Sequence, residues 1–295
     1  MLISCIIPTY KRDHLLARAV SSVLTQEISC ARIEIVVVND SGDSLKKADW
    51  QEDPRVTVVT TYHTERCVAR NTGAALSRGD YLHFLDDDDM LLPGAYQALL
   101  PVADATQAAW TYGAYEIVNN DGECLQTVPP VVRGKIFAII VAGAAIPMGA
   151  SLIDRGAFFA VGAFDLDYAA EEDTELMQRI SLHGETEMVN QVVARFRVGT
   201  QGISTTKWEH VPELGRLKRE KVFALPCCLS QLGHSLREHE EGYLRGRLVR
   251  YYLGSAARHA HSAPLTAISR FGIGCRLSLP SLLSRKFWRS LTGKW

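Results

Sequence analysis

Tyr81–Asp89, YLHFLDDDD, places four consecutive aspartates directly after a short apolar run. The run predicts a buried strand, because it is rich in β-favouring residues and too short for a typical helix. Four adjacent like charges repel one another, and a folded core gains nothing from them. We therefore expect the aspartates to serve a site at the carboxyl end of this strand.

Alternate positions of an extended chain face the same way, so Asp86 and Asp88 can turn toward one cation. Oxygen-only coordination suits Mn²⁺ or Mg²⁺, and such ions usually keep waters and share their site with substrate phosphates. Two other interpretations fit less well. A cap for a helix starting near Leu92-Pro93 needs one or two acids rather than four. A calcium-binding helix-loop-helix lacks its required glycine and glutamate here.

The composition indicates an ordinary globular protein. The chain has 295 residues, of which 47% are hydrophobic, enough for a sizeable core. Its seven cysteines form no Cys-x-x-Cys pair and leave an odd number, so neither a zinc site nor a disulfide framework is indicated. This cysteine usage favours a reducing cytoplasm. Met1–Pro8 lacks the basic leader of a signal peptide and predicts a strand instead.

Predicted strands and helices alternate over the first hundred residues. The strands are expected at 2–8, 33–39, 56–60 and 81–85, and the helices at 13–25 and 67–76. This alternation predicts an α/β fold with a parallel sheet and right-handed crossovers, in which ligands bind at the carboxyl ends of the strands. Thr9-Tyr10, Asn39-Asp40 and Asp86–Asp89 follow three of the strands, so we expect them to meet at one edge.

The rest of the chain predicts further elements before its character changes. We expect a hairpin with strands at 109–118 and 125–128, a strand at 148–153, a helix at 172–182 and an extended segment at 189–198. The uncharged run 136–153 is just long enough to span a membrane, but Gly143, Pro147 and Gly149 interrupt it. It predicts a buried helix followed by a buried strand.

Charge is divided unevenly along the chain. Residues 1–242 contain 22 Lys+Arg and 33 Asp+Glu, which gives −11, whereas residues 243–295 contain ten Lys+Arg and no acid, which gives +10. We place a domain boundary near residue 205, with a catalytic domain at 1–205 and a basic helical extension at 206–295. The basic end suggests an anionic partner, either a lipid surface or a nucleic acid.

Several motifs occur in a characteristic order: IIPTYKR at 6–12, VVVNDSGD at 36–43, VARNTGAALSRGDYLHFLDDDD at 68–89, VGAFD at 161–165 and EEDTELMQR at 171–179. Together they resemble the family-2 nucleotide-sugar glycosyltransferases. The resemblance covers about two-thirds of the chain. It implies a GT-A fold, a Rossmann-like, mostly parallel central sheet flanked by helices, and an inverting, metal-dependent sugar transfer.

The resemblance also implies roles for individual residues. Pro8, Thr9 and Tyr10 border the nucleoside pocket, Asp40 hydrogen-bonds the base, and Arg70 lies near the phosphates. Asp86, Asp87 and Asp88 belong to the motif that holds donor and metal, with Asp86 and Asp88 as the expected metal ligands. Asp173, with Glu172 beside it, stands at the position of the catalytic base. Without the resemblance, the acids at 171–173 could simply complement a helix dipole.

Two departures from the family pattern refine the expectation. Many relatives carry a histidine after the last sheet strand, but Phe196–Ser204 has none, which leaves His210 or no histidine at all. The Gln-x-x-Arg-Trp signature of processive enzymes is absent, which favours addition of a single sugar. We expect a UDP-sugar donor and, as acceptor, the hydroxyl of a glycan or lipid-linked saccharide in bacterial-type cell-surface polysaccharide synthesis.

The basic end of the chain leaves two interpretations open. Residues 270–295 combine leucines and aromatics with basic residues, which suits either a membrane interface or a helical appendage packed on the catalytic domain. The first predicts an enzyme peripheral on the cytoplasmic face of the membrane, and nucleic-acid binding is not expected, since no stacking motif accompanies the charge. Rival functions are a catalytically silent glycan- or nucleotide-binding module, a protein glycosyltransferase, and a sugar-nucleotide pyrophosphorylase, whose glycine-rich phosphate loop Pro8–Arg18 lacks.

Overall fold

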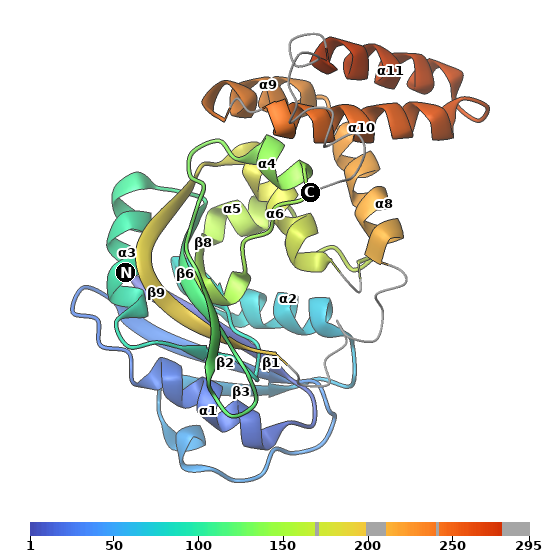
Figure 1. The fold of residues 1–295 in the computed structure, drawn as a ribbon. Helices are drawn as coiled ribbons and strands as arrows, with labels where there is room; N and C mark the ends of the chain where they lie inside the picture. The colour runs from blue at the N-terminus through green and yellow to red at the C-terminus, as the bar shows by residue number, and fades with distance from the viewer. Residues whose placement is uncertain (169–170, 199–210, 240–241, 279–295) are drawn as a thin grey trace. The chain divides into compact units, whose positions relative to one another are not determined.

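The computed structural model describes residues 1–168, 171–198, 211–239 and 242–278 (Figure 1). These residues belong to two compact units. The first consists of Met1–Arg133 and Ile146–Gly215, and the second of Gly134–Ala145 and Arg216–Trp295. The expected boundary at residue 205 lies outside the described residues. The short segment 134–145, expected within the catalytic domain, groups with the second unit.

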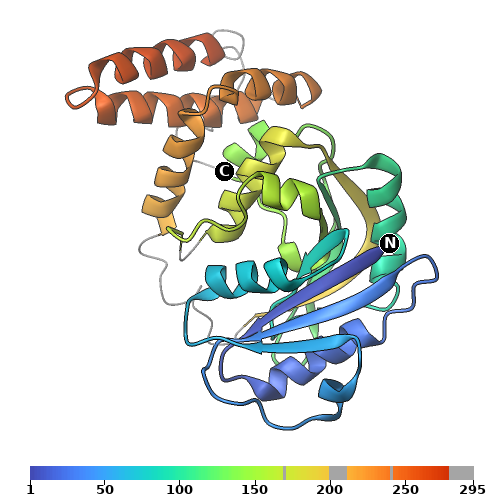
Figure 2. The same cartoon turned by 180° about the vertical axis from the view of Figure 1, so that it is seen from behind.

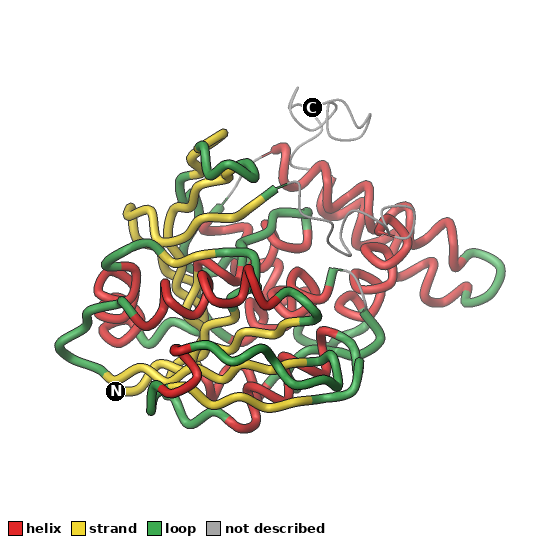
Figure 3. The backbone as a smooth tube through the Cα atoms, turned by 90° about the horizontal axis from the view of Figure 1, so that it is seen from below, coloured by secondary structure: helices red, strands yellow, loops and turns green. Residues whose placement is uncertain are grey.

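The first unit is built on one sheet of nine strands. Figure 3 draws the strands in yellow. Its first half is parallel, in the order β3-β2-β1-β4. The strands are β1 (Leu2–Thr9), β2 (Arg32–Asn39), β3 (Val56–Thr60) and β4 (Tyr81–Phe84). All four match the expected positions. β1, β2 and β4 are largely buried and so are near-continuous apolar runs in the sequence, whereas β3 lies at the edge of the sheet and has no buried residue.

The second half of the sheet is mixed. Beyond β4 the order continues β8-β6-β9-β5, with β7 paired to β6. The strands are β5 (Met90–Leu91), β6 (Trp110–Val118), β7 (Cys124–Val128), β8 (Ser151–Asp154) and β9 (Thr186–Arg197). β6 pairs antiparallel with β7 and β8 but parallel with β9. The predicted α/β class with a Rossmann-like sheet is confirmed, and so is the hairpin.

Helices cover both faces of the sheet (Figure 1, Figure 2). Ile3, Cys5 and Ile7 of β1 pack in one core with α1 (Asp13–Leu24) and α3 (Ala95–Thr106). The opposite face of the sheet carries α2 (Arg66–Leu76), α5 (Arg155–Ala160) and α6 (Glu172–His183). On that face Phe84 of β4 contacts Phe158 of α5, with ring centroids 5.2 Å apart.

Gly73 sets how closely α2 approaches the sheet. A Cβ added at this glycine would lie 2.4 Å from Ile6 Cγ2. We expect Gly73→Ala to lower the free energy of unfolding by about 1–3 kcal/mol, because the helix must shift outward. Gly272→Ala is the control, since a Cβ there meets nothing within 4 Å. Thermal denaturation measures both variants, and equal melting temperatures would contradict the prediction.

His83 lies in β4, shortly before the four aspartates, but it is a core residue. Its side chain is buried, with Nδ1 2.7 Å from Tyr96 Oη and Nε2 3.1 Å from the Gly149 carbonyl oxygen. Burial lowers the pKa of His83 to about 4, so the ring is neutral near pH 7. It is a hydrogen-bonded core residue beneath the aspartates.

The run 136–153 forms α4 (Phe137–Val141), then a 3₁₀ turn at Met148–Ala150, then β8. The predicted helix and strand are confirmed, although the strand starts three residues later than expected. Across the described residues, no helix combines the length and apolar character needed to cross a bilayer.

The second unit is helical. It contains α4, α8 (Val211–Phe223), whose first residues belong to the first unit, α9 (Cys228–Glu238), α10 (Gly242–His259) and α11 (Pro264–Ser278). α4 joins α9 through a hydrogen bond of 3.0 Å from the Ala138 backbone nitrogen to Ser235 Oγ. α8 joins α10 through the stacked rings of Phe223 and Tyr252, whose centroids are 4.1 Å apart.

Candidate active site

The carboxyl ends of β1, β2 and β4 meet at one edge of the sheet, as the sequence predicts. Thr9 Oγ1 donates a hydrogen bond to Asp87 Oδ2 at 2.7 Å. The Asp40 backbone nitrogen donates to the Thr9 carbonyl oxygen at 2.9 Å. The strands are parallel neighbours with β1 in the centre, so their ends lie together although residues 9 and 87 are far apart in sequence.

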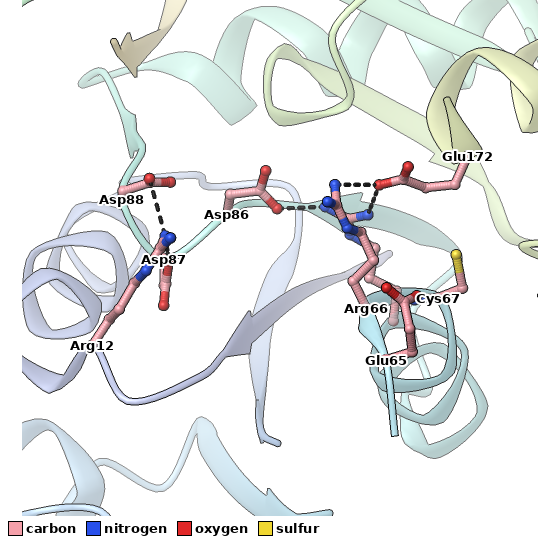
Figure 4. Close-up of polar contacts among 9 residues, drawn as sticks. Arg12, Glu65, Arg66, Cys67, Asp86, Asp87, Asp88 and Glu172 are labelled. Carbon is pink, nitrogen blue, oxygen red and sulfur yellow. Dashed lines mark hydrogen bonds and ion pairs between the residues drawn. The ribbon is translucent and has the colours of Figure 1, made fainter. Parts of the chain in front are cut away.

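The aspartates after β4 alternate in direction (Figure 4). Asp87 points away from Asp86 and Asp88 and is buried against Thr9 and Arg12. Burial raises the pKa of Asp87 to about 6, although the Thr9 hydrogen bond and the Arg12 charge act in the opposite direction. Asp87 therefore fixes the loop, whereas Asp86 and Asp88 turn to the other side (Figure 4). The segment is a turn rather than the expected extended chain, because the Asp89 backbone nitrogen donates a hydrogen bond of 3.1 Å to the Asp86 carbonyl oxygen.

Arg12 joins the loop after β1 to the aspartates. Its Nη1 atom lies 3.2 Å from Asp87 Oδ1 and 3.2 Å from Asp88 Oδ2. The side chain of Asp88 is 14% exposed. A guanidinium in contact with both carboxylates offsets the repulsion between adjacent negative charges. The positive charge of Arg12 thus offsets part of the negative charge of Asp87 and Asp88.

Arg70 of α2 is the buried centre of the site. Its Nη2 donates to Asp86 Oδ1 at 2.6 Å, and its Nη1 donates to Glu172 Oε1 at 2.8 Å. Burial alone would lower the pKa of Arg70, but the charges of Asp86 and Glu172 outweigh it and raise that pKa well above the usual value. Arg70 therefore connects the end of β4 to the first turn of α6 with a permanent positive charge.

The two acids at the start of α6 have different surroundings. The Glu172 side chain is only 4% exposed, and its Oε1 accepts hydrogen bonds from both Arg66 and Arg70 at 2.8 Å. Asp173 is half-buried and its Oδ1 accepts from the Thr174 backbone nitrogen at 2.7 Å. Glu172 is thus held as an anchor in the first turn of α6, and Asp173 lies beside it with its side chain partly exposed.

Asp40 organises the loop before α2. Its carboxylate accepts hydrogen bonds from Thr61 Oγ1, from the backbone nitrogen and Oγ1 of Thr64, and from the Glu65 backbone nitrogen, at 2.7–3.1 Å. Burial raises the pKa of Asp40, but these donors outweigh it and hold the pKa below its usual value. Glu65 adopts φ 95°, a left-handed conformation, so the network holds a strained loop in place.

The residues expected around the nucleoside lie at the same edge. Pro8 pairs with Val38 near the end of β1. Tyr10 is exposed and stacks on His63 of the Asp40-bound loop, with ring centroids 4.5 Å apart. The strand ends therefore offer an aromatic surface beside a fixed carboxylate, an arrangement suited to a planar heterocycle.

These contacts join the residues expected around a nucleotide to the buried guanidinium of Arg70 and to the acids at the start of α6. The family model described as glycosyl transferase family 2 matches residues 4–126. The chain carries a family 2 glycosyltransferase domain. That match includes Asp40, Arg70 and the aspartates after β4, whereas the acids of α6 lie beyond it.

Curated relatives agree with this assignment. The chain is 23% identical over 255 residues to the Escherichia coli UDP-Glc:alpha-D-GlcNAc-diphosphoundecaprenol beta-1,3-glucosyltransferase WfgD, covering 83% of this chain and 98% of that protein. It is 28% identical to the poly(ribitol-phosphate) beta-N-acetylglucosaminyltransferase TarP of Staphylococcus aureus (strain N315), covering 56% of this chain and 48% of that protein.

Solved structures show the same fold. TarS 1–349 of S. aureus in complex with UDP-GlcNAc matches with a TM-score of 0.66 at 13% identity, covering 100% of this chain and 93% of that chain. The complex of TarS 1–349 with UDP matches with a TM-score of 0.62 at 15% identity, covering 97% of this chain and 93% of that chain. The predicted GT-A fold is thereby confirmed.

Asp86 and Asp88 are the residues that would hold a divalent metal ion in this glycosyltransferase. Asp86 is 51% exposed in its side chain, and Asp86 and Asp88 turn to the same side as hard oxygen donors. No group of three or more His, Cys, Asp or Glu side chains forms a complete metal cage within the described part of the chain. Two carboxylates suit a divalent ion that completes its coordination with waters and donor phosphates. His210 and residues 199–204, considered for a further ligand, lie outside the described residues.

Arg12 and Arg66 are two site residues for which the sequence alone predicted no role. Arg12 belongs to the quoted IIPTYKR motif, and its position directly after a strand end was an available signal. Arg66 precedes Arg70 by four residues, the spacing at which two helical side chains reach the same partner. Their partners, Asp88 and Glu172, come from segments 76 and 106 residues away, which no local pattern reveals.

Proposed function

We propose that this glycosyltransferase transfers one hexose-type sugar from a UDP-sugar to a hydroxyl of a lipid-linked saccharide, with inversion at the transferred carbon. The WfgD relative, named as a UDP-Glc enzyme acting on a diphosphoundecaprenol-linked sugar, supports this donor and acceptor class. The product would enter cell-surface polysaccharide synthesis at the cytoplasmic face of the membrane. A second relative, TarP, is named as an N-acetylglucosaminyltransferase that acts on poly(ribitol-phosphate).

One observation carries the proposal: Arg70 binds Asp86 and Glu172 at the same time. Asp86 ends the strand at which the donor diphosphate is expected, and Glu172 begins the helix that carries Asp173. The Glu172–Arg70 pair is almost fully buried, with side chains 4% and 5% exposed, so its geometry is rigid. The donor side and the acceptor side of the reaction are therefore held together by one guanidinium.

On the donor side, Tyr10 would stack on the base, and Pro8 and Thr9 would border it. The Asp40 network would keep the adjoining loop ready for the base. Asp86 and Asp88 would hold Mn²⁺ or Mg²⁺, which supplies Lewis-acid stabilisation of the charge that develops on the departing diphosphate. Arg12 and Arg70 would add positive charge beside the phosphates.

On the acceptor side, Asp173 would accept the proton of the attacking hydroxyl. A hydroxyl is a poor nucleophile until a positioned base removes its proton, and one carboxylate is sufficient for that role. Arg66 and Arg70 bind Glu172 and so fix the first turn of α6. Attack from the face opposite the diphosphate inverts the configuration of the transferred carbon.

The proposal is tested by mixing the purified protein with individual UDP-sugars, Mn²⁺ and a short-chain polyprenyl diphosphate sugar. We expect release of UDP and formation of a disaccharide product with one donor. A thermal-shift screen of the same donors should raise the melting temperature with that donor, because a ligand that binds the folded state stabilises it. Donor binding without any turnover would favour a silent binding module instead.

Metal removal is expected to abolish transfer without unfolding the protein. Treatment with EDTA should lower the rate of UDP release at least about 100-fold, because the two carboxylates then offer the diphosphate no cation. The fold should persist, since Arg70 and Arg12 already contact Asp86 and Asp88. Circular dichroism before and after treatment checks the fold, and addition of Mn²⁺ or Mg²⁺ should restore the rate. Full activity in EDTA would exclude a metal requirement.

A further inference from the structure

A concentration of guanidinium groups lies on the second unit, outside the site described above. Residues 216–295 contain 15 Lys+Arg and four Asp+Glu, so this part of the chain is strongly basic. Arg219 of α8 and Arg247 and Arg250 of α10 gather around one phenol ring, that of Tyr251. We refer to Arg219, Arg247, Arg250 and Tyr251 as the Tyr251 cluster.

The cluster has a defined geometry. The guanidinium carbons of Arg219, Arg247 and Arg250 lie 4.2, 5.9 and 5.6 Å from the centroid of the Tyr251 ring. Arg247 Nη2 also donates a hydrogen bond of 2.9 Å to Tyr251 Oη. All four side chains are half-buried. They are therefore partly desolvated yet accessible to a ligand.

Rigid packing beneath the cluster holds α8 and α10 together. Glu220 of α8 accepts hydrogen bonds of 2.8 Å from both Ser255 and Arg258 of α10. The backbone of Gly143 also lies close, since a Cβ added there would be 2.8 Å from Arg247 Nη2. The guanidiniums thus sit on a fixed framework rather than on mobile loops.

Three cations in this small volume repel one another, and partial burial strengthens that repulsion. The π face and the phenol oxygen of Tyr251 offset part of that repulsion. Burial raises the pKa of Tyr251, but the neighbouring arginines outweigh that effect and lower it. The neighbouring arginines therefore favour a negative charge near Tyr251 Oη.

Apolar side chains on the same unit indicate the kind of ligand. Leu265, Ile268 and Phe271 recur every three residues along α11 and are 83%, 69% and 58% exposed. A row of exposed large apolar residues on a basic helical unit is typical of a segment that lies at a membrane interface. If α11 lies at a membrane interface, the anion that the second unit binds is expected to be the headgroup of a lipid.

We propose that the Tyr251 cluster binds the phosphate oxygens of a lipid-borne phosphate group, with the diphosphate of the acceptor's lipid carrier as its ligand. Planar guanidinium forks match phosphate oxygens, and three of them lie around the single ring of Tyr251. This inference rests on the proposed function for the identity of the acceptor. The binding itself requires neither donor nor sugar transfer.

The test is flotation of the full chain with three kinds of vesicle: phosphatidylcholine alone, phosphatidylcholine with phosphatidylglycerol, and phosphatidylcholine with a polyprenyl diphosphate. The variant pair R219Q/R250Q is compared with R237Q/R276Q, which removes the same charge from exposed positions of the second unit. We expect R219Q/R250Q to weaken binding of polyprenyl diphosphate vesicles at least about tenfold, because convergent guanidiniums are lost. R237Q/R276Q should change it less than about threefold.

Inorganic pyrophosphate should compete with the vesicles for the wild-type protein. If R219Q/R250Q weakened binding to phosphatidylglycerol vesicles as much as binding to polyprenyl diphosphate vesicles, the cluster would still bind phosphate, but its ligand would be the bulk lipid headgroup.

The proposal would be overturned if R219Q/R250Q and R237Q/R276Q weakened binding equally, or if the wild-type protein bound no vesicle. A UDP-induced thermal shift in R219Q/R250Q shows that the variant is folded. Failure of sugar transfer with intact flotation would refute the proposed function and leave this inference standing.

Discussion

Asp173→Asn is expected to lower the kcat of sugar transfer by about 10²–10⁴-fold, the contribution typical of a positioned general base. Asparagine keeps the shape of the side chain but accepts no proton at neutral pH, so the hydroxyl stays a weak nucleophile. The hydrogen bond from the Thr174 backbone nitrogen to Oδ1 survives the change, which preserves the first turn of α6. The measurement is the steady-state rate of product formation at saturating donor.

Asp121→Asn is the control for this variant, because it removes an exposed carboxylate from the β6–β7 turn. Its rate should equal that of the wild type. Donor binding by Asp173→Asn, measured by thermal shift with UDP, should also remain, since the proposal places no donor contact on this residue. A kcat within about threefold of the wild type would assign the base to another residue.

Arg70→Met is expected to abolish turnover and to destabilise the first unit. The methionine side chain fills a similar volume but leaves Glu172 without one of its two cations. Removing one partner of a buried ion pair costs about 3–5 kcal/mol, because the remaining charge stays in a poorly solvated place. Denaturant unfolding measures the stability, and UDP release measures the turnover.

Arg66→Gln provides the comparison for Arg70→Met. It removes the other hydrogen bond to Glu172 but keeps the link from Arg70 to Asp86. The loss of stability should therefore be smaller, because the Arg66 side chain is 23% exposed and water can replace it. If Arg66→Gln and Arg70→Met lost the same activity and stability, Arg70 would have no special role in joining the two sides of the site.

The four aspartates after β4 are compensated by partners within the protein, so this edge of the sheet can fold without a ligand. Four adjacent carboxylates would destabilise the edge of the sheet if their charges stood alone. Asp86 and Asp88 each contact an arginine, Asp87 is hydrogen-bonded by Thr9, and Asp89 accepts from the Arg197 backbone nitrogen at 3.0 Å. Burial and the neighbouring acids raise the pKa of Asp89 well above its usual value. Each of the four acids thus has a polar partner from another segment of the chain.

Local patterns in the sequence determined the strands and helices of the first hundred residues. Buried parallel strands such as β1 and β2 are continuous apolar runs, and the intervening helices show apolar residues at helical spacing. Parallel topology then implies that Thr9, Asp40 and Asp86 meet at one edge. The β5 strand was missed because Met90–Leu91 has only two residues, too few to form a pattern.

The tertiary structure alone decided what each acid of the site does. The sequence shows Glu172 beside Asp173 and Asp87 beside Asp86, with nothing to separate their roles. Glu172 became an anchor because Arg66 and Arg70 reach it from α2, more than 100 residues earlier. Hydrophobic periodicity is a property of neighbouring residues, so it is visible along the chain. Ion pairing depends on which segments the fold brings within about 3 Å, and that distance exists only after the chain has packed.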